Sequence, residues 1–381
     1  MIMKRMIAVL LCICLFFCAC SSQPQETQPA STAAPTTQAT TAAPTTEPTT
    51  VATTVAPTTE PTTAPTTVPA PVYPHPLNGS SLEEPWSGRP TAIVFNNIID
   101  CLPQHGIGQA DIVYEYETEG GITRMLGIFD DLSDVGSIGP VRSSRSFFNS
   151  TAVAYGAPII HCGGSVPGRN GHYSDNGARI QNWVHVDETY NGGYFFRDQA
   201  RLNSGMSREH TLFTTGEKLI QALKDKGFNT PNPADTDYGL QFEEAVALNG
   251  EAANSVVITF RAGKTTTMTY NPATGVYEAS QYNRAQIDGN TGKTVTYTNV
   301  VALYTSQWFI HDGEYYRSFY NLFGSGKGYY ACGGEIVPIQ WHREGLNTPF
   351  TFTLEDGTPL LLAPGTTYVG VASDSKTISY Q

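Results

Sequence analysis

A long segment that cannot build a core constrains this chain more than any other feature. Residues 21–72 consist almost entirely of Thr, Pro, Ala and Gln, and the octet at 43–50 recurs at 56–63. Such a composition buries too little apolar surface to offset the loss of chain entropy, and its prolines favour extended backbone. We therefore predict a disordered tether over 20–72, with a reach on the order of 150 Å when fully extended. Residues 73–381 must supply the fold.

The start of the chain has the pattern of an export signal. Lys4 and Arg5 precede an apolar stretch, 6–19, that ends at Cys20. This stretch is too short to cross the ~30 Å hydrocarbon core of a bilayer comfortably, so we expect a lipoprotein signal peptide over 1–19. Its removal would leave the Cys20 thiol free to carry lipid, and two or more acyl chains hold a protein firmly on a membrane. We expect lipid anchoring on the extracytoplasmic face of the cell membrane, with ordinary secretion as the alternative.

Charge and cysteine content exclude several classes of partner and fold. The chain carries 34 acidic against 22 basic residues, and the basic residues are scattered singly. Nucleic-acid binding depends on clustered Lys and Arg that displace counterions, so we expect no nucleic-acid partner. After the tether the chain has only Cys101, Cys162 and Cys332, an odd number that allows at most one disulfide. Packing must hold the core together.

Strand and turn signals divide the remaining residues into two expected domains. The first, 73–228, mixes strands and helices in an α+β pattern and contains a buried strand at 90–96. The Pro-containing stretch 229–237 is the expected link between the domains. From Ser255 onward, Val, Thr and Tyr alternate between turn signals, which is typical of antiparallel strands. We therefore predict a β-rich second domain over 229–381.

Three glutamates occupy alternate positions in an expected hairpin. Residues 111–119 alternate, the glycines at 120–121 suit the positive-φ positions of a two-residue turn, and 122–129 return. Because side chains alternate along a strand, the glutamates would share one face as a carboxylate ladder. The ladder consists of Glu115, Glu117 and Glu119, with Arg124 directly across from Glu117. Three interpretations stay open: a solvated sheet face, a cation site, or a general acid and base pair.

Two arginines precede the next apolar stretch. Arg142 and Arg145 lie in the run 139–146, and the apolar residues 147–155 predict a helix that ends at Gly156. The amide-rich start of a helix with two arginines suits a carboxylate or a phosphate. The alternative is that both arginines only neutralise the neighbouring acidic side chains.

A second buried strand is expected at 157–162, followed by a Gly-rich loop. The end of this strand is a natural ligand site, which we expect to include His161, Gly163, Gly164 and Ser165. His161 and Cys162 point to opposite faces of a strand and cannot act together as base and nucleophile. A partnership of Cys162 with His172, His185 or His210 stays open, although a buried free thiol is the commoner situation.

No segment has the spacing of a metal or cofactor site. The turn at 288–292 offers several oxygens, but it lacks the distal Glu that calcium loops use. We expect a plain turn there, no metal and no cofactor.

Several segments of the chain resemble a known family, the YerB-like family of proposed bacterial lipoproteins. The resemblance is dense in the first domain and looser in the second, and it covers 106–124, 139–145, 163–165, 299–301, 326–328, 339–341 and 362–365. It implies a three-layer α+β first domain followed by a β-rich domain. The family has no assigned function, so the resemblance assigns no catalytic residue. One departure lies at 101–105, where this chain lacks an arginine that the family tends to have at the presumed mouth of a cleft.

Two functions from different classes follow from these observations. The first, which we favour, is a tethered binding or scaffolding module for a cell-wall ligand or an envelope protein. Its cleft would draw on the ladder, Arg124, the two arginines at the helix start and the Gly-rich loop. The second is a cell-envelope hydrolase or transferase that uses two of the ladder glutamates as acid and base.

Overall fold

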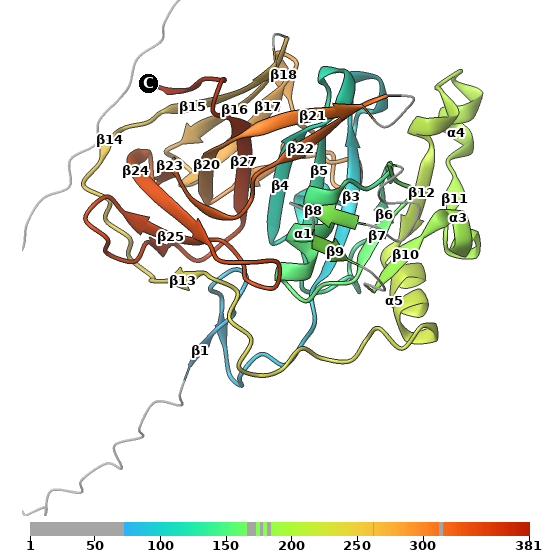
Figure 1. Cartoon of the computed structure of the whole chain (residues 1–381), viewed down its shortest axis with the longest axis horizontal. Coiled ribbons are helices and arrows are strands. Elements are labelled where there is room, and N and C mark those ends of the chain that lie inside the picture. The colour runs from blue at the N-terminus through green and yellow to red at the C-terminus, as the bar shows by residue number, and fades with distance from the viewer. Residues whose placement is uncertain (1–71, 166–172, 176–177, 181–183, 262, 312–314) are drawn as a thin grey trace, which may run out of the picture. The chain divides into compact units, whose positions relative to one another are not determined.

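A mixed sheet of eleven strands forms the centre of the computed structural model (Figure 1). The model describes residues 72–165, 173–175, 178–180, 184–261, 263–311 and 315–381. From the first half of the chain the sheet takes β3 (Thr91–Asn97), β4 (Ile112–Glu117), β5 (Thr123–Phe129), β7 (Ile159–His161) and β10 (His185–Asp187). From the second half it takes β14 (Glu251–Ala252), β20 (Asn299–Thr305), β23 (Gly324–Cys332), β24 (Glu335–Arg343), β25 (Thr351–Leu354) and β27 (Thr367–Ser373). The strand order is β10-β7-β3-β5-β4-β27-β20-β23-β24-β14, and β25 pairs with β24.

The two halves of the chain meet in the middle of this sheet, where β4 and β27 pair in parallel. The register places Ile112 beside Thr367 and Tyr116 beside Val371. Every residue of β3, β4, β5 and β27 is buried, including polar side chains such as Asn96, Glu115 and Arg124. The expected buried strand at 90–96 is confirmed as β3. The domain division at 228/229 stays a prediction, and the sheet passes through both halves.

A second, six-stranded sheet covers one face of the central sheet. It consists of β15 (Ser255–Arg261), β16 (Lys264–Asn271), β17 (Val276–Gln281), β18 (Arg284–Ala285), β19 (Thr296–Tyr297) and β28 (Ile378–Tyr380). Burial alternates along β15, and its inward residues Val256 and Ile258 share a core with Phe95 of β3. Gly370 of β27 permits the close approach of the two sheets, because a Cβ there would lie 2.7 Å from Ile258 Cδ1.

Helices are few in the described part of the chain, and they lie on both faces of the central sheet. They are α1 (Ser146–Ala154), α3 (Glu188–Asn191), α4 (Gln199–Asn203) and α5 (Gly216–Asp225), with 3₁₀ turns η1 (Ile99–Cys101), η2 (Ile107–Gln109), η3 (Glu119–Gly121), η4 (Gly192–Tyr194) and η5 (Arg208–His210). Leu219 of α5 packs in the core that contains Phe95, whereas Phe147 and Phe148 of α1 pack with Val94 on the opposite face.

Short pairs of strands complete the structure. A three-stranded sheet contains β6 (Ser137–Ile138), β11 (Phe196–Arg197) and β12 (Leu212–Thr215). The two-stranded pairs are β1 (Tyr73–Pro74) with β2 (Ser81–Leu82), β8 (Tyr173–Asp175) with β9 (Ala178–Ile180), β13 (Gln241–Phe242) with β26 (Leu361–Leu362), and β21 (Gln307–His311) with β22 (Tyr316–Tyr320). The strand-rich character expected of the chain is confirmed, and the three-layer arrangement of the first domain stays a prediction.

The helix expected after the two arginines is present as α1. It ends at Ala154, and Gly156 follows with a φ of 61°, the left-handed conformation expected of a glycine that closes a helix. Its N-cap is Arg145, whose side chain makes no capping hydrogen bond, so a serine or threonine cap is not used.

The hairpin of β4 and β5 has a different register from the expected one. Its loop contains three residues, 119–121, and both glycines have positive φ values of 75° and 72°. Glu117 therefore pairs with Thr123, and Arg124 pairs with Tyr116. One extra loop residue moves Arg124 to the opposite face of the sheet from Glu115 and Glu117. Glu119 lies in the loop, so the expected ladder of three glutamates on one face is wrong.

None of the helices in the described part of the chain is both long and apolar enough to cross a bilayer.

Candidate functional site

Glu115 lies between the two sheets and is fully buried. Its Oε1 is 2.9 Å from the Lys264 ammonium nitrogen, and Lys264 also donates to Thr266 and Gln281. Four further groups donate to the carboxylate: Thr123 and Asn97 to Oε1 at 2.5 and 2.9 Å, and Thr266 and Tyr368 to Oε2 at 2.8 and 2.7 Å. Burial alone would raise the pKa of Glu115, but the Lys264 charge and these donors hold it below its ordinary value.

The other two glutamates occupy different environments. Glu119 accepts two hydrogen bonds of 2.7 Å from the Arg145 guanidinium. Burial works to raise the pKa of Glu119, but this bidentate pair lowers it below the ordinary value. Burial raises the pKa of Glu117, despite the positive charges of Lys376 and Arg261 nearby. Neither the solvated face nor a shared acid and base pair describes these three side chains.

Arg124 belongs to a buried cluster of arginines. Its Nη1 donates to the Ser143 carbonyl at 2.6 Å, and its buried Nε has no hydrogen-bond partner. Burial lowers the pKa of Arg124 well below its ordinary value, and the charges of Arg145 and Arg142 lower it further. Glu119 is the carboxylate that counters this cluster most directly, through its pair with Arg145. The cluster therefore favours an additional anion.

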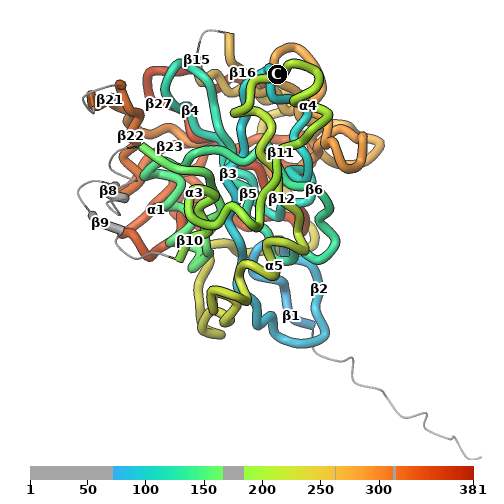
Figure 2. The backbone as a smooth tube through the Cα atoms, turned by 90° about the vertical axis from the view of Figure 1, so that its right-hand side faces the viewer, coloured from blue at the N-terminus to red at the C-terminus, as the bar shows by residue number. Residues whose placement is uncertain are grey.

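A cavity of about 390 Å³ lies beside this cluster, and its lining includes Arg197 of β11 and Leu212 of β12. Figure 2 views the molecule from the side on which β11 and β12 lie. Three arginines and one glutamate line the cavity, namely Arg142, Arg197, Arg208 and Glu209. The other lining residues are small polar or apolar ones: Val141, Ser143, Cys162, Ser207 and Leu212. The Arg142 guanidinium is 3.2 Å from the Glu209 carboxylate. The lining carries a net positive charge, whereas the whole chain has a formal charge of −12.

Backbone hydrogen bonds fix the wall of this cavity. Cys162 donates to the Arg142 carbonyl at 3.1 Å, and Ser144 donates to the Gly163 carbonyl at 3.0 Å. Ser144 also forms an isolated parallel bridge with Gly164. The structure thus brings the residues before α1 alongside the Gly-rich loop, in which Ser165 is buried. Two parts of the expected cleft lie together, while Glu115 is sealed elsewhere between the sheets.

The Cys162 thiol borders the cavity but is not arranged as a nucleophile. Its Sγ lies 3.1 Å from a Glu188 carboxylate oxygen. Burial, and then this hydrogen bond and the Glu188 charge, raise the pKa of Cys162 to about 12. His210 contacts Asn96 at 2.8 Å, and His172 lies outside the described residues. Cys101 and Cys332 are also free thiols.

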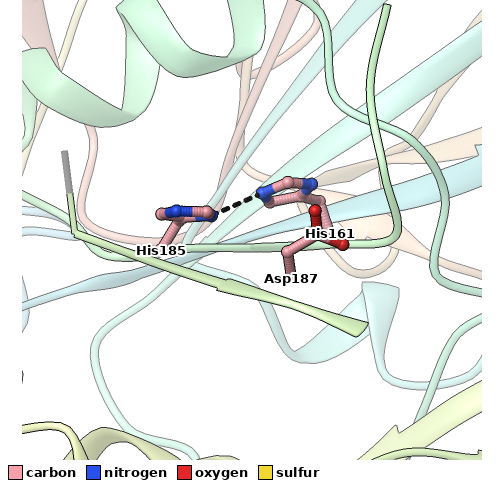
Figure 3. Close-up of side chains that lie close together, drawn as sticks. All are labelled: His161, His185 and Asp187. Carbon is pink, nitrogen blue, oxygen red and sulfur yellow. Dashed lines mark hydrogen bonds between the residues drawn. The ribbon is translucent and has the colours of Figure 1, made fainter. Parts of the chain in front are cut away.

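His161 lies at the centre of a cluster with His185 and Asp187 (Figure 3). Its Nδ1 is 2.9 Å from the Gly163 carbonyl, and its Nε2 is 3.1 Å from His185 Nδ1. Asp187 Oδ1 accepts hydrogen bonds from the backbone of Gly163 at 2.7 Å and of Thr189 at 3.0 Å. Burial lowers the pKa of His161 to about 4, although the Asp187 charge works to raise it.

Sequence reasoning missed several residues of these sites. Arg197 lies in the two-residue strand β11 and Arg208 begins the 3₁₀ turn η5, both without a motif, so no local signal associated them with Arg142. Asp187 could have been associated with His185, because the two alternate on one strand. Their proximity to His161 depends on the parallel pairing of β7 with β10, which the sequence does not reveal.

The chain is similar to proteins whose function is unknown. Residues 77–229 match the family model described as "Protein of unknown function (DUF3048) N-terminal domain", and residues 256–369 match its C-terminal counterpart. A relative from Bacillus subtilis (strain 168), described as "Putative lipoprotein YerB", is 28% identical over 306 residues, which are 78% of this chain and 86% of the relative. The crystal structure of the YerB protein from Bacillus subtilis has a TM-score of 0.67 and 25% identity, and the match covers 81% of this chain and 99% of that chain.

Proposed function

This chain belongs to the DUF3048 family, and we propose that it is a membrane-anchored binding protein that takes an anionic ligand of the cell envelope. The ligand occupies the arginine-lined cavity beside β7 and β12. Its recognised group is a phosphate or a carboxylate, because guanidinium groups pair with both through two parallel hydrogen bonds.

One observation carries the proposal. Arg142, Arg197 and Arg208 converge on a cavity in an otherwise acidic protein. Glu209 is the acidic residue in the lining, and Glu188 pairs with Arg197 at 3.6 Å from outside it, so three cations face two carboxylates. Behind the wall, the Arg124 side chain is buried with an unpaired Nε. A buried cation without full compensation is unfavourable, and an anion in the cavity would relieve it.

Anchoring is the second part of the proposal. The relative from Bacillus subtilis is described as a "Putative lipoprotein", which supports the same processing at Cys20 of this chain. After removal of residues 1–19, the tether over 20–72 would hold the domains over 73–228 and 229–381 away from the membrane on its extracytoplasmic face. We expect Cys20→Ala to move the protein from the membrane fraction to the soluble fraction of cells. A variant that stays with the membranes contradicts the anchor.

Isothermal titration calorimetry tests the cavity with defined probes. The full mature chain is titrated in detergent with inorganic phosphate, glycerol phosphate, citrate and a muropeptide that carries free carboxylates. Charge-assisted hydrogen bonds contribute roughly 1.5–3 kcal/mol each. An Arg142→Ala, Arg208→Ala variant should therefore bind the active probe at least about tenfold more weakly than the parent.

The matched control removes two exposed cations elsewhere. Arg284→Ala, Lys327→Ala lowers the net charge equally, and both residues are exposed and lie outside the cavity. Binding should be unchanged in this control. Equal loss of affinity in both double variants would reduce the effect to net charge, and unchanged affinity in the cavity variant would refute the site.

We do not extend the proposal to hydrolysis or group transfer. Two of the three glutamates that such chemistry would use are each held by a cation, Glu115 by Lys264 and Glu119 by Arg145. Glu117 has a raised pKa, and the charges that act on it are those of the cations Lys376 and Arg261.

A further inference from the structure

Two parallel strands bring three metal-binding side chains to one point. In the pairing of β7 with β10, Asp187 lies directly beside His161, and His185 lies two residues before Asp187 on the same face. One ligand atom from each of these three residues lies within 4.8 Å of the other two (Figure 3). From this geometry we propose that His161, His185 and Asp187 form a binding site for a divalent transition metal, with Zn²⁺ as the ion of best fit.

The chemistry of the three groups supports this choice. Two imidazoles and one carboxylate are a ligand set that Zn²⁺ uses in sites with one position left open, and imidazole suits zinc, copper, iron and nickel better than calcium or magnesium. The proposal concerns binding of the ion and does not depend on ligand exchange or catalysis at its open coordination position. The ion would be held by three residues on two adjacent strands, which are rigid supports for such a site.

The separations are close to those that a tetrahedral ion requires. Ligand atoms bound at about 2.0–2.1 Å in tetrahedral geometry lie roughly 3.3–3.5 Å apart. The two facing nitrogens, His161 Nε2 and His185 Nδ1, are 3.1 Å apart. The largest separation in the set is at most 4.8 Å, so the carboxylate needs a shift of roughly 1 Å to complete the geometry.

Hydrogen bonds behind the ligands orient them for this role. The Gly163 carbonyl accepts from His161 Nδ1 at 2.9 Å, and this bond leaves the lone pair of Nε2 directed at His185. The backbone amides of Gly163 and Thr189 hold Asp187 Oδ1. His161 is fully buried and Asp187 is 5% exposed, so the ion would be shielded from most of the solvent.

The site is separate from the cavity of the proposed function. Cys162 follows His161 but points to the other face of β7, where it borders the cavity. The metal site can therefore be present whether or not the cavity binds an anion. Gly163 forms hydrogen bonds with His161 and Asp187 and accepts a hydrogen bond from Ser144, the neighbour of the cavity-lining Ser143, so a bound ion would stiffen the loop next to the cavity wall.

Equilibrium dialysis of the full mature chain against Zn²⁺, with metal content measured by mass spectrometry, tests the proposal. We expect one equivalent of Zn²⁺ per chain. Loss of a direct ligand weakens binding more than the ~10–100-fold known for groups behind the ligands, so Asp187→Asn and His185→Ala should each reduce the affinity at least about a hundredfold. Co²⁺ should give the visible absorption of a four-coordinate ion in the parent and lose it in both variants.

Two matched controls keep the outcome interpretable. His342→Ala removes an exposed histidine from another strand, and Cys162→Ser removes the neighbouring thiol, and both should bind Zn²⁺ like the parent. Asp187→Asn keeps a carbonyl oxygen for the two backbone amides, and circular dichroism checks that it folds. A folded Asp187→Asn and His185→Ala pair that binds Zn²⁺ like the parent, or a parent that binds neither ion, would show that the cluster is only a hydrogen-bonded structural unit.

Discussion

Lys264 and Glu115 form an ion pair in which both side chains are buried. Removing two charges from water is unfavourable. The pair is tolerated because hydroxyl and amide groups form hydrogen bonds with the carboxylate and ammonium atoms that do not bond to each other. Glu115 lies within one matched family region and Lys264 within the other. The pair therefore joins the two regions. It stabilises the fold only when both partners are present, because either charge alone would be buried without compensation.

Breaking this pair should be far more harmful than replacing it. Lys264→Met leaves the Glu115 charge buried without a partner, and we expect a loss of about 3–5 kcal/mol in the free energy of unfolding measured with urea. A Glu115→Leu, Lys264→Met double variant should recover most of this loss, because no charge is then buried. A double variant that is less stable than Lys264→Met alone would show that the surrounding donors, rather than the pair, determine the stability.

The remaining two glutamates should give opposite pH dependence. The pKa of Glu119 is lowered on folding, so its stabilisation is present above an ordinary carboxyl pKa and is lost as the pH falls through the folded value. The pKa of Glu117 is raised, so its ionisation opposes folding once the pH rises above the ordinary value. In melting curves from pH 7 to 3, Glu119→Gln should be less stable than the parent at pH 7, with a gap that closes in acid.

Glu117→Gln is the matched comparison for that series. It should be more stable than the parent at pH 7 and equal to it at pH 3, where Glu117 is protonated in both the folded and the unfolded chain. Parallel curves for the parent and both variants would contradict the assigned environments.

At the scale of elements, local sequence signals predicted individual strands and the helix. They did not predict which distant segments pair with each other. β3 and α1 were predictable because apolar runs, Pro and Gly mark their ends. The hairpin register was not, since it depends on whether the turn has two residues or three. Of the candidate site, the association of Arg142 with the Gly-rich loop was predicted, whereas Lys264, Arg197 and Asp187 come from distant segments without a motif.

Gly370 tests the packing of the two sheets. The Cβ of Gly370→Ala would meet Ile258 Cδ1 at 2.7 Å, and overpacking of this kind destabilises by about 1–3 kcal/mol. Ile258→Val removes that methyl group and alone costs about 0.5–1.5 kcal/mol. We expect the double variant to be more stable than the sum of the two single changes predicts, in urea unfolding experiments. Simple additivity would mean that the sheets do not meet at this point.

At the scale of the whole molecule, the central sheet and the two expected domains differ in whether residues 73–228 can fold alone. β4 and β27 pair over Ile112–Tyr116 and Thr367–Val371, and every residue of both strands is buried. A fragment ending at residue 228 would expose this edge of β4. It would also bury Glu115 without Lys264, or expose it to water.

We therefore expect the fragment 73–228 to lack a cooperative thermal transition when it is produced alone. Adding the fragment 229–381 should restore a transition, because β27 then covers β4. Calorimetry of the two fragments, separately and mixed, measures this directly. A cooperative transition in 73–228 alone would establish it as an independent domain, as the sequence predicts.

The large distance in sequence between β4 and β27 also has a consequence for the order of events during folding. β4 ends at Glu117, and its neighbour β27 spans Thr367–Ser373, so this edge of β4 stays open until Thr367–Ser373 has been made. Pairing between segments so distant in sequence is slow, and an open strand edge readily pairs with other chains. Until β27 pairs with it, this edge of β4 can therefore form contacts between chains instead of contacts within one chain.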